Sequence, residues 1–530
     1  MKKILLTPIT LFIFIAGMSA QMDRYIDEVF SEVTILTDQT YGANVDVLQQ
    51  GLIELKTDIY SPTGDTETNR PVVLLSHTGS FIPRIFNQAA TGFKDDSVVV
   101  EVATRLAKRG YVVFAYTYRQ GWLPQSTDDN VRKGTLLQAA YRAIQDTRTL
   151  ARYIRRTVDQ NANPFGVDGT KIAAWGIGTG GYLSFGAATL DDPEEVELDK
   201  FINTATLEPF ADTLVLGNFD GTSFGTLNGD TVAIPNHVGY NSDIQMAVNM
   251  GGALGDASWI DGDASSNEPP MVGFHAPTDI FAPYYIGPVI VPGPNFVVLD
   301  EASGTREAIE LANDFGLNDV LEGIPASDDP LKPIIDFYKT VDVSIAGENI
   351  KLGTDNFYPT VGLTPGAGSP WDWWDLNVLR ARVAGINNIF GTDFNADTIH
   401  QSGLLTNPDM SGEKAKRYVD TVFMVAAPRL CQGLGLDCGF SGVNTITAQD
   451  VSLKIGPNPA TDVVNFSSDI ENPITRIVIF DATGRAVKQI DDLRVNDYQL
   501  QLNEFSAGNY YVGISFDRGL VVEQLTILRN

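Results

Sequence analysis

The first half of the chain alternates between near-continuous apolar runs and segments with helical periodicity. Apolar runs of this kind are typical of parallel strands that are buried on both faces. Val98–Lys108 and the segment from Leu137 to Val158 carry apolar side chains at helical spacing, and Gly110 follows the first of them as a helix-ending residue. Strands are expected at Pro71–Leu75, Tyr111–Tyr116, Lys171–Trp175, Met246–Met250 and Met271–His275. This order predicts an α/β domain with a mostly parallel sheet flanked by helices.

From about residue 440 the pattern changes to short alternating runs separated by Gly and Asp turns. Ile474–Phe480 and Tyr510–Phe516 are the clearest of these runs. Their spacing favours a small antiparallel β-sandwich. We therefore expect an α/β domain at residues 21–438, a linker at 439–452 that is rich in Ser, Thr and Gly, and an all-β domain at 453–530.

The N-terminus has the composition of a secretory signal peptide. Lys2 and Lys3 precede the apolar stretch Ile4–Ala16, and the small residues Ser19-Ala20 follow it. The apolar stretch is shorter than the roughly 20 residues that a membrane-spanning helix needs. Residues 1–20 are thus predicted to be a signal peptide, and no transmembrane segment is expected after its cleavage.

Charge and composition narrow the function classes. The 530 residues include 37 basic and 66 acidic side chains, a formal charge of -29, which disfavours binding to nucleic acid because the field repels phosphates. No Asp-rich loop has the ligand spacing of a calcium site, so neither a metal nor a cofactor is predicted. Cys431 and Cys438 are the only cysteines, and either a disulfide or two buried thiols fits the sequence.

The C-terminal segment resembles the type A sorting domain of the bacterial type IX secretion system. Three pieces carry the resemblance in the order of the family: Gly456–Asp462, Phe480–Val487 and Phe505–Val512. Alone, each piece is only turn chemistry between strands. The resemblance implies that the type IX machinery is a partner through this domain and that the protein is secreted or held at the cell surface.

Residues 50 to about 430 resemble the α/β-hydrolase family, especially its carboxylesterase-like members. Leu55–Pro62 is similar to the first strand of that family, and Leu75–Phe81 to the His-Gly-Gly loop whose N–H groups hold an oxyanion. Gly110–Arg119 matches the next strand with its Tyr-Arg ending. Gln145-Asp146 and Phe165–Asp168 then lead to the strand before the nucleophile elbow. The resemblance implies an α/β-hydrolase-like fold with an insertion at about 329–397.

The elbow itself lacks the serine of the family. Gly-x-Ser-x-Gly places a nucleophilic serine on a tight strand-to-helix turn. Here the turn reads Gly176-Ile-Gly178-Thr-Gly180, so Gly178 stands at the nucleophile position. A shifted register with Thr179 as nucleophile would put Ile177 where the turn needs a small residue. The candidate oxyanion or binding residues that the resemblance leaves are Thr78, Gly79 and Thr179.

The resemblance identifies a triad acid but no histidine at the expected place. His275-Ala-Pro-Thr-Asp279 is similar to the loop of the family whose aspartate orients the catalytic histidine. After a helix at Arg306–Phe315 and a strand near Val320, the histidine would lie at about Gly323–Pro330, where there is none. His400 is the remaining candidate, as a displaced triad histidine ahead of a helix at Gly412–Pro428. The catalytic candidates are thus Asp279 and His400.

Two readings of function follow from these residues. In the first, the domain is a degenerate, serine-less hydrolase that binds a ligand, glycan or partner, and the glycine at the elbow favours this reading. In the second, it is an active extracellular esterase that uses Asp279 and His400 with a non-standard nucleophile or with directly activated water. A small-molecule ester or a glycan is the expected ligand class. The tryptophan-rich Pro370–Trp374 either lines a binding groove or forms the core of a lid.

Overall fold

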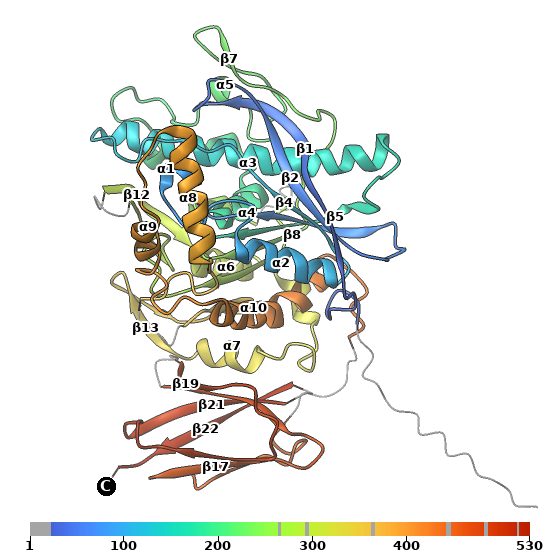
Figure 1. Cartoon of the computed structure of the whole chain (residues 1–530), viewed down its shortest axis with the longest axis vertical. Helices are drawn as coiled ribbons and strands as arrows, with labels where there is room; N and C mark the ends of the chain where they lie inside the picture. Colours follow the sequence, from blue (N-terminus) through green and yellow to red (C-terminus); the bar gives the residue numbers. More distant parts are fainter. Residues whose placement is uncertain are drawn as a thin grey trace, which may run out of the picture.

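The computed structural model describes residues 23–262, 267–291, 296–361, 366–440, 447–481, 486–516 and 519–529. The predicted signal peptide at 1–20 lies outside the described residues. Figure 1 shows a large α/β body above a smaller all-β tail. None of the described helices is long and apolar enough to cross a membrane.

The body is built on an eight-stranded sheet in the order β1-β2-β4-β3-β5-β8-β10-β15. β1 and β2 are antiparallel to each other, β2 is antiparallel to β4, and the pairs from β4 to β15 are parallel. The central strands are buried along most of their length, as their apolar runs predict. The strands are β1 (Val33–Asp46), β2 (Gly51–Pro62), β3 (Arg70–Ser76), β4 (Val112–Tyr116), β5 (Val167–Ile177), β8 (Met246–Met250), β10 (Met271–His275) and β15 (Phe357–Pro359).

Helices cover both faces of this sheet. The chain moves from β3 to β4 in one direction across the sheet and from β5 to β8 in the other, so right-handed crossovers place their helices on opposite faces. α2 (Ser97–Lys108) and α10 (Gly412–Gly433) contact each other, and α3 (Asp129–Gln160) packs on α4 (Thr179–Thr189). The remaining helices are α1 (Arg84–Asn87), α5 (Thr213–Leu216), α6 (Thr305–Asp314), α7 (Lys332–Tyr338), α8 (Leu376–Phe390) and α9 (Ala396–Gly403).

Short elements decorate the body between these helices. A three-stranded sheet has the order β11-β12-β9, and two hairpins pair β6 with β7 and β13 with β14. α8 and α9, orange in Figure 1, stand beside α1 and share a small core made by Ala90, Leu379, Val383 and Ile399. The short strands are β6 (Gly225–Leu227), β7 (Asp230–Ala233), β9 (Ala253–Leu254), β11 (Ile286–Val291), β12 (Phe296–Gly304), β13 (Asp342–Ile345) and β14 (Glu348–Lys351).

The structure changes the sequence-based description of the segment after α6. The strand expected near Val320 is wrong: residues Asp319–Gly323 form a 3₁₀ helix, in which Leu321 is buried and Val320 is 44% exposed. The last strand of the main sheet is β15, which pairs with β10 and comes from the segment assigned to an insertion at about 329–397. The loop that follows the last strand therefore begins at Thr360 and not at Gly323.

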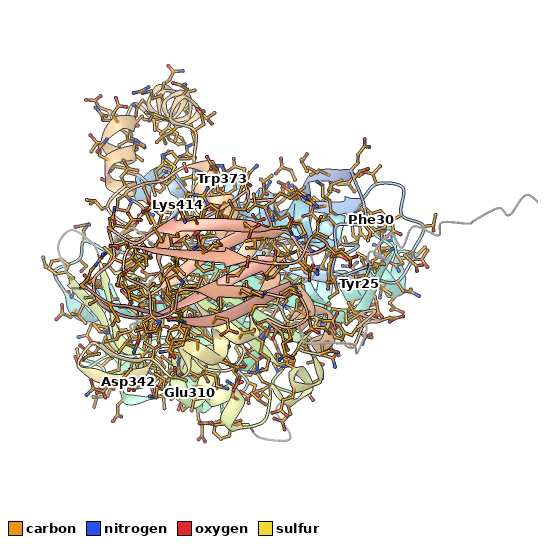
Figure 2. The ribbon with its side chains drawn as sticks, turned by 90° about the horizontal axis from the view of Figure 1, so that it is seen from below. Tyr25, Phe30, Glu310, Asp342, Trp373 and Lys414 are labelled. Carbon is orange, nitrogen blue, oxygen red and sulfur yellow. A yellow bond between two sulfur atoms is a disulfide. The ribbon has the colours of Figure 1, made fainter. Side chains whose placement is uncertain are left out.

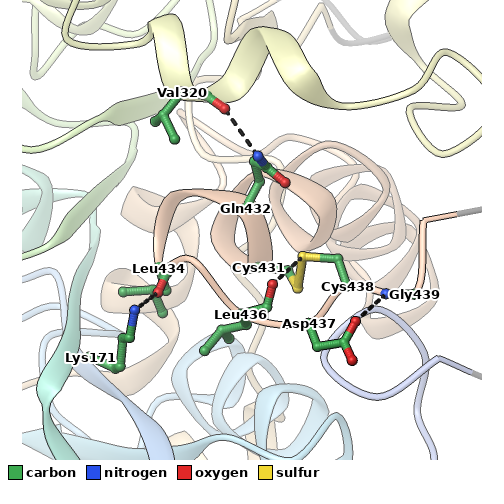
Figure 3. Close-up of a disulfide and its surroundings, with 9 residues drawn as sticks. All are labelled: Lys171, Val320, Cys431, Gln432, Leu434, Leu436, Asp437, Cys438 and Gly439. Atoms are coloured by element: carbon green, nitrogen blue, oxygen red, sulfur yellow. Dashed lines mark hydrogen bonds between the residues drawn. A yellow bond between two sulfur atoms is a disulfide. The ribbon is translucent and has the colours of Figure 1, made fainter. Parts of the chain in front are cut away.

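A disulfide closes the end of α10. Cys431 on the helix is bonded to Cys438 in the turn after it, so the alternative of two free thiols does not apply (Figure 3). Lys171 from β5 donates a hydrogen bond of 2.6 Å to the carbonyl oxygen of Leu434 within this loop. This hydrogen bond ties the disulfide-closed loop after α10 to the main sheet.

The tail is a sandwich of two antiparallel sheets with the orders β16-β17-β20 and β19-β18-β21-β22. Its own core includes Phe466, Ile477, Val512 and Leu525. Figure 2, seen from the tail side, shows these strands lying across the body. The strands are β16 (Lys454–Gly456), β17 (Val463–Ser467), β18 (Ile474–Phe480), β19 (Ala486–Ile490), β20 (Asp497–Gln501), β21 (Gly508–Phe516) and β22 (Gly519–Ile527).

Candidate functional site

Gly178 occupies the tip of a tight turn between β5 and α4. Its φ of 55° and ψ of -118° lie in a region that residues other than glycine rarely adopt. The neighbouring glycines are required by close backbone approach, since a Cβ on Gly176 would lie 1.8 Å from the carbonyl oxygen of Gly180. Thr179 is already the first residue of the helix, so the tip of the elbow is Gly178 and not Thr179.

The side chain of Thr78 fills the space above this tip. Thr78 follows β3 in the loop that resembles the His-Gly-Gly sequence. A Cβ built on Gly178 would lie 2.3 Å from Thr78 Oγ1 and 2.8 Å from Thr78 Cβ, well inside van der Waals contact. A serine at position 178 is therefore sterically incompatible with the present position of Thr78.

Hydroxyl groups of the chain already bind the N–H groups around the elbow. In hydrolases of this type, the N–H that follows the nucleophile and N–H groups of the loop after β3 stabilise an oxyanion. Here the Ser80 N–H donates a hydrogen bond of 2.7 Å to Thr179 Oγ1. The Thr179 N–H donates a longer one, of 3.5 Å, to Thr78 Oγ1. Gly79, between these residues, allows a close approach to Gly92, since a Cβ on Gly79 would lie 3.0 Å from Gly92 Cα.

Asp279 lies in the loop after β10, and main-chain N–H groups hold its carboxylate through Oδ1. Oδ1 accepts hydrogen bonds from the N–H groups of Phe281 at 2.7 Å and Ala282 at 3.3 Å. Oδ2 is 3.4 Å from Nε2 of His275, whose other nitrogen is 2.9 Å from Thr305 Oγ1. The carboxylate is thus fixed in place, and the imidazole next to it belongs to the end of β10.

His400 lies apart from these contacts, on α9. Its Nδ1 accepts a hydrogen bond of 3.1 Å from the indole N–H of Trp374, and the two rings meet edge to face. Within the described residues, no hydrogen bond or ion pair joins His400 to Asp279. Of the tryptophans near it, Trp371 is 1% exposed and packs against Gly251, whereas Trp374 lines a cavity.

Asp372, which the sequence analysis did not single out, lies in the loop after β15. In the family that the body resembles, this is the loop that carries the triad histidine, and residues 360–375 contain none. The loop packs onto Asp279, because a Cβ on Gly368 would lie 3.2 Å from Asp279 Cα. Asp372 Oδ1 is buried without a hydrogen-bond partner in the described structure. Burial, and then the charges of Asp96 and Asp279, raise the pKa of the Asp372 carboxyl to about 8.

The elbow and both carboxylates open into one cavity of about 1000 Å³. Its wall is made by loops and helices of the body, among them α9 and the loop after β15 that carries Trp374. Most of the wall is apolar, and the aromatic side chains among the described lining residues are Phe81, Phe86, Trp122, Tyr141, Tyr182, Phe201, Trp259, Phe281 and Trp374. The Tyr182 hydroxyl is buried without a hydrogen-bond partner in the described structure, and burial followed by the charge of Asp279 raises the pKa of this phenol.

The described residues contain no group of three or more His, Cys, Asp or Glu side chains placed to hold a metal ion. Asp279 and Asp372 are the only two carboxylates in the described lining of the cavity. The geometry therefore offers a largely apolar cavity with two acids in its wall, beside an elbow tip that has no side chain and is covered by Thr78.

Comparisons with known proteins give two matches along the chain. Residues 57–285 match the family model BD-FAE, and residues 454–528 match the model of the secretion system C-terminal sorting domain. No curated protein matches the chain. Two solved structures of esterases are each similar to part of the chain.

One of these structures is Thermogutta terrifontis esterase 2 phosphorylated by paraoxon. It has 18% sequence identity and a TM-score of 0.26, and the alignment covers 48% of this chain and 74% of the other. A truncated form of a carbohydrate esterase from gut microbiota has 15% identity and a TM-score of 0.29, with coverage of 55% and 86%.

The order of the main sheet, the elbow between β5 and α4 and the two family models agree with one another. The chain therefore contains an esterase-like α/β-hydrolase domain followed by a type IX sorting domain, which directs it to the cell surface or the extracellular space.

Proposed function

We propose that the hydrolase domain is a secreted binding protein that keeps the cavity of an esterase and has lost its covalent chemistry. The observation that carries this proposal is the pair of residues at the elbow: Gly178 has no side chain, and Thr78 fills the space that a nucleophile would need. Without a nucleophile, the acyl-enzyme route has no first step.

The hydrogen bonds around the elbow support the same proposal. An oxyanion hole stabilises a transition state because its donors are free to meet the developing charge. Here the hydroxyls of Thr179 and Thr78 accept from the Ser80 and Thr179 N–H groups. A substrate oxygen would have to displace both hydroxyls. Thr78, Gly79 and Thr179 thus act in this proposal as the floor of a binding site.

An active hydrolase is the alternative, and the buried carboxylate of Asp279 is the observation that favours it. In that reading, Asp279 and His400 activate water directly. A general base must come within hydrogen-bond reach of the proton it removes. The engagement of His400 Nδ1 by the Trp374 indole argues against this alternative, because it occupies the acceptor nitrogen of the neutral ring.

Steady-state hydrolysis of p-nitrophenyl butyrate by residues 21–530 separates the two readings. We expect no turnover above the rate without protein, both for the wild-type chain and for the His400→Ala variant. Turnover by the wild-type chain that disappears in His400→Ala or Asp279→Asn would overturn the binding-protein proposal and establish the alternative.

The resemblance and the cavity together suggest a class of ligand. A small-molecule ester or a glycan is the class expected from the resemblance, and the type IX machinery is the expected partner of the tail. The cavity supports a small, largely apolar ligand, since aromatic and aliphatic side chains make up most of its described wall.

A further inference from the structure

The charge of the cavity wall has one sign. Asp279 and Asp372 are its acidic side chains, and no Lys, Arg, His or Glu is among the described residues that line it. Carboxylates against low-dielectric walls concentrate a negative potential inside a cavity. The cavity therefore favours a cation over a neutral or anionic group.

Asp372 has a buried side-chain oxygen, Oδ1, that lacks a hydrogen-bond partner in the described structure. Asp96 is 3.1 Å from Arg84 and accepts hydrogen bonds from Gly92 and Phe93. Asp279 accepts from two N–H donors through Oδ1, and its Oδ2 lies 3.4 Å from His275 Nε2. For Asp372, in contrast, the described residues supply no hydrogen bond to Oδ1.

Lys414 is linked to Asp372 through Asn407, and its ammonium group already has other hydrogen-bond acceptors. Lys414 donates to Asn407 Oδ1 at 2.7 Å and to Asp409, while Asn407 Nδ2 donates to the main-chain oxygen of Asp372 at 2.7 Å. Lys414 thus orders the loop but does not bond the carboxylate in the described structure. A buried carboxylate without a partner is costly, and a bound cation would remove that cost.

The aromatic wall suits a cation attached to an apolar body. Trp259, Trp374 and Tyr182 line the same cavity as the two acids. Aromatic faces attract cations, with Trp the strongest, and they also bury the apolar part of a ligand. A free divalent metal ion is disfavoured, because calcium takes six to eight oxygen ligands and the described residues present no such cluster.

We propose that the cavity binds a primary amine with an apolar body, whose ammonium group sits between Asp279 and Asp372. This inference rests on the proposed function, since it names the ligand class of the same non-catalytic cavity. The phenolic oxygen of Tyr182, which has no partner in the described structure, accepts a further hydrogen bond from the ammonium.

Three probes of one shape test the charge preference on the whole secreted chain, residues 21–530. They are 3-phenylpropylamine, 3-phenylpropanol and 3-phenylpropanoate, and titration calorimetry at pH 8 gives each Kd. We expect the amine to bind at least about tenfold more tightly than the alcohol, and the carboxylate to bind most weakly.

Two matched variants locate the preference. Asp372→Asn is expected to weaken amine binding by about tenfold more than it weakens alcohol binding. Asp375→Asn removes the same charge three residues away, at the N-cap of α8 where asparagine also caps, and is expected to change neither affinity. Circular dichroism checks that both variants fold. If a variant does not fold, the Kd values of the three probes on the wild-type chain still test the preference for a cation.

Each contrary result has a distinct meaning. Equal binding of amine, alcohol and carboxylate would overturn the cation site while leaving the binding function in place. Absence of binding by all three probes, in a chain that hydrolyses no ester, would overturn the amine inference alone. Turnover of p-nitrophenyl butyrate that depends on Asp279 would overturn the proposed function and this inference together.

Discussion

At the scale of single residues, the elbow differs from that of an esterase by more than one substitution. Gly178 has no side chain, and Thr78 occupies the space that one would need. Asp372 lies in the loop that would carry the histidine. Gly178→Ser restores the hydroxyl but leaves Thr78 in its space and no histidine in the loop of Asp372. We therefore expect this variant to hydrolyse no p-nitrophenyl butyrate.

Asp372 also predicts a pH dependence of stability. Its carboxyl has a raised pKa of about 8, from burial and from Asp96 and Asp279, and an unfolded aspartate titrates near 4. Between these pH values the unfolded chain binds fewer protons at this residue than the folded chain, so the free energy of unfolding falls as the pH rises and levels off above about 8.

The Asp372→Asn variant should lack this contribution. Its free energy of unfolding, measured by urea denaturation, should exceed that of the wild-type chain by a margin that grows between pH 5.5 and 8. The growth is at most about 1.4 kcal/mol per pH unit. Asp375→Asn, which is the control, should follow the wild-type curve. A constant margin between wild type and Asp372→Asn at every pH would contradict the assignment.

At the scale of elements, strands with a strong local pattern could be predicted and the last strand could not. Met246–Met250 and Met271–His275 are strands with the predicted bounds, because each is a buried apolar run. β15 has three residues, ends at Pro359 and pairs with β10, so it has no periodicity of its own. Val320-Leu321 looked more like a strand but forms a 3₁₀ turn.

The same limit applies to the candidate site. The turn at Gly178 and the loop at Asp279 could be placed from sequence, because each stands in a recognisable local motif. Asp372 could not be identified, since its interest comes from Asp279 and Asp96, which only the fold brings near it. The role of Thr78 likewise depends on a contact between the loop after β3 and the elbow after β5.

At the scale of the whole molecule, the sorting domain packs on the body that it exports. Tyr511 on β21 lies with its ring centroid 4.0 Å from that of Phe337 on α7. Phe480 meets Tyr338 edge to face at 6.0 Å, and Arg417 Nε on α10 is 3.7 Å from Asp491 Oδ2. The contact is mainly aromatic, so removal of the tail would expose an apolar face of α7.

A double-mutant cycle measures this contact. Phe337→Ala and Tyr511→Ala should show a coupling free energy of about 0.5–1.5 kcal/mol in unfolding by urea, since the two rings are in direct contact at an interplanar angle of 39°. Phe337→Ala and Tyr498→Ala provide the control, because Tyr498 is on β20 in the other sheet of the tail. Full additivity of Phe337→Ala and Tyr511→Ala would show that the tail does not dock through these rings.

Labelling with a fluorophosphonate, followed by intact mass spectrometry, shows whether the hydrolase body has a covalent nucleophile. The wild-type chain is predicted to gain no adduct. The variant Thr78→Gly/Gly178→Ser/Asp372→His, which supplies the space, the nucleophile and a histidine beside Asp279, is predicted to gain one adduct at position 178. An adduct on the wild-type chain, at Thr179 or at any other residue of the cavity, would contradict the account.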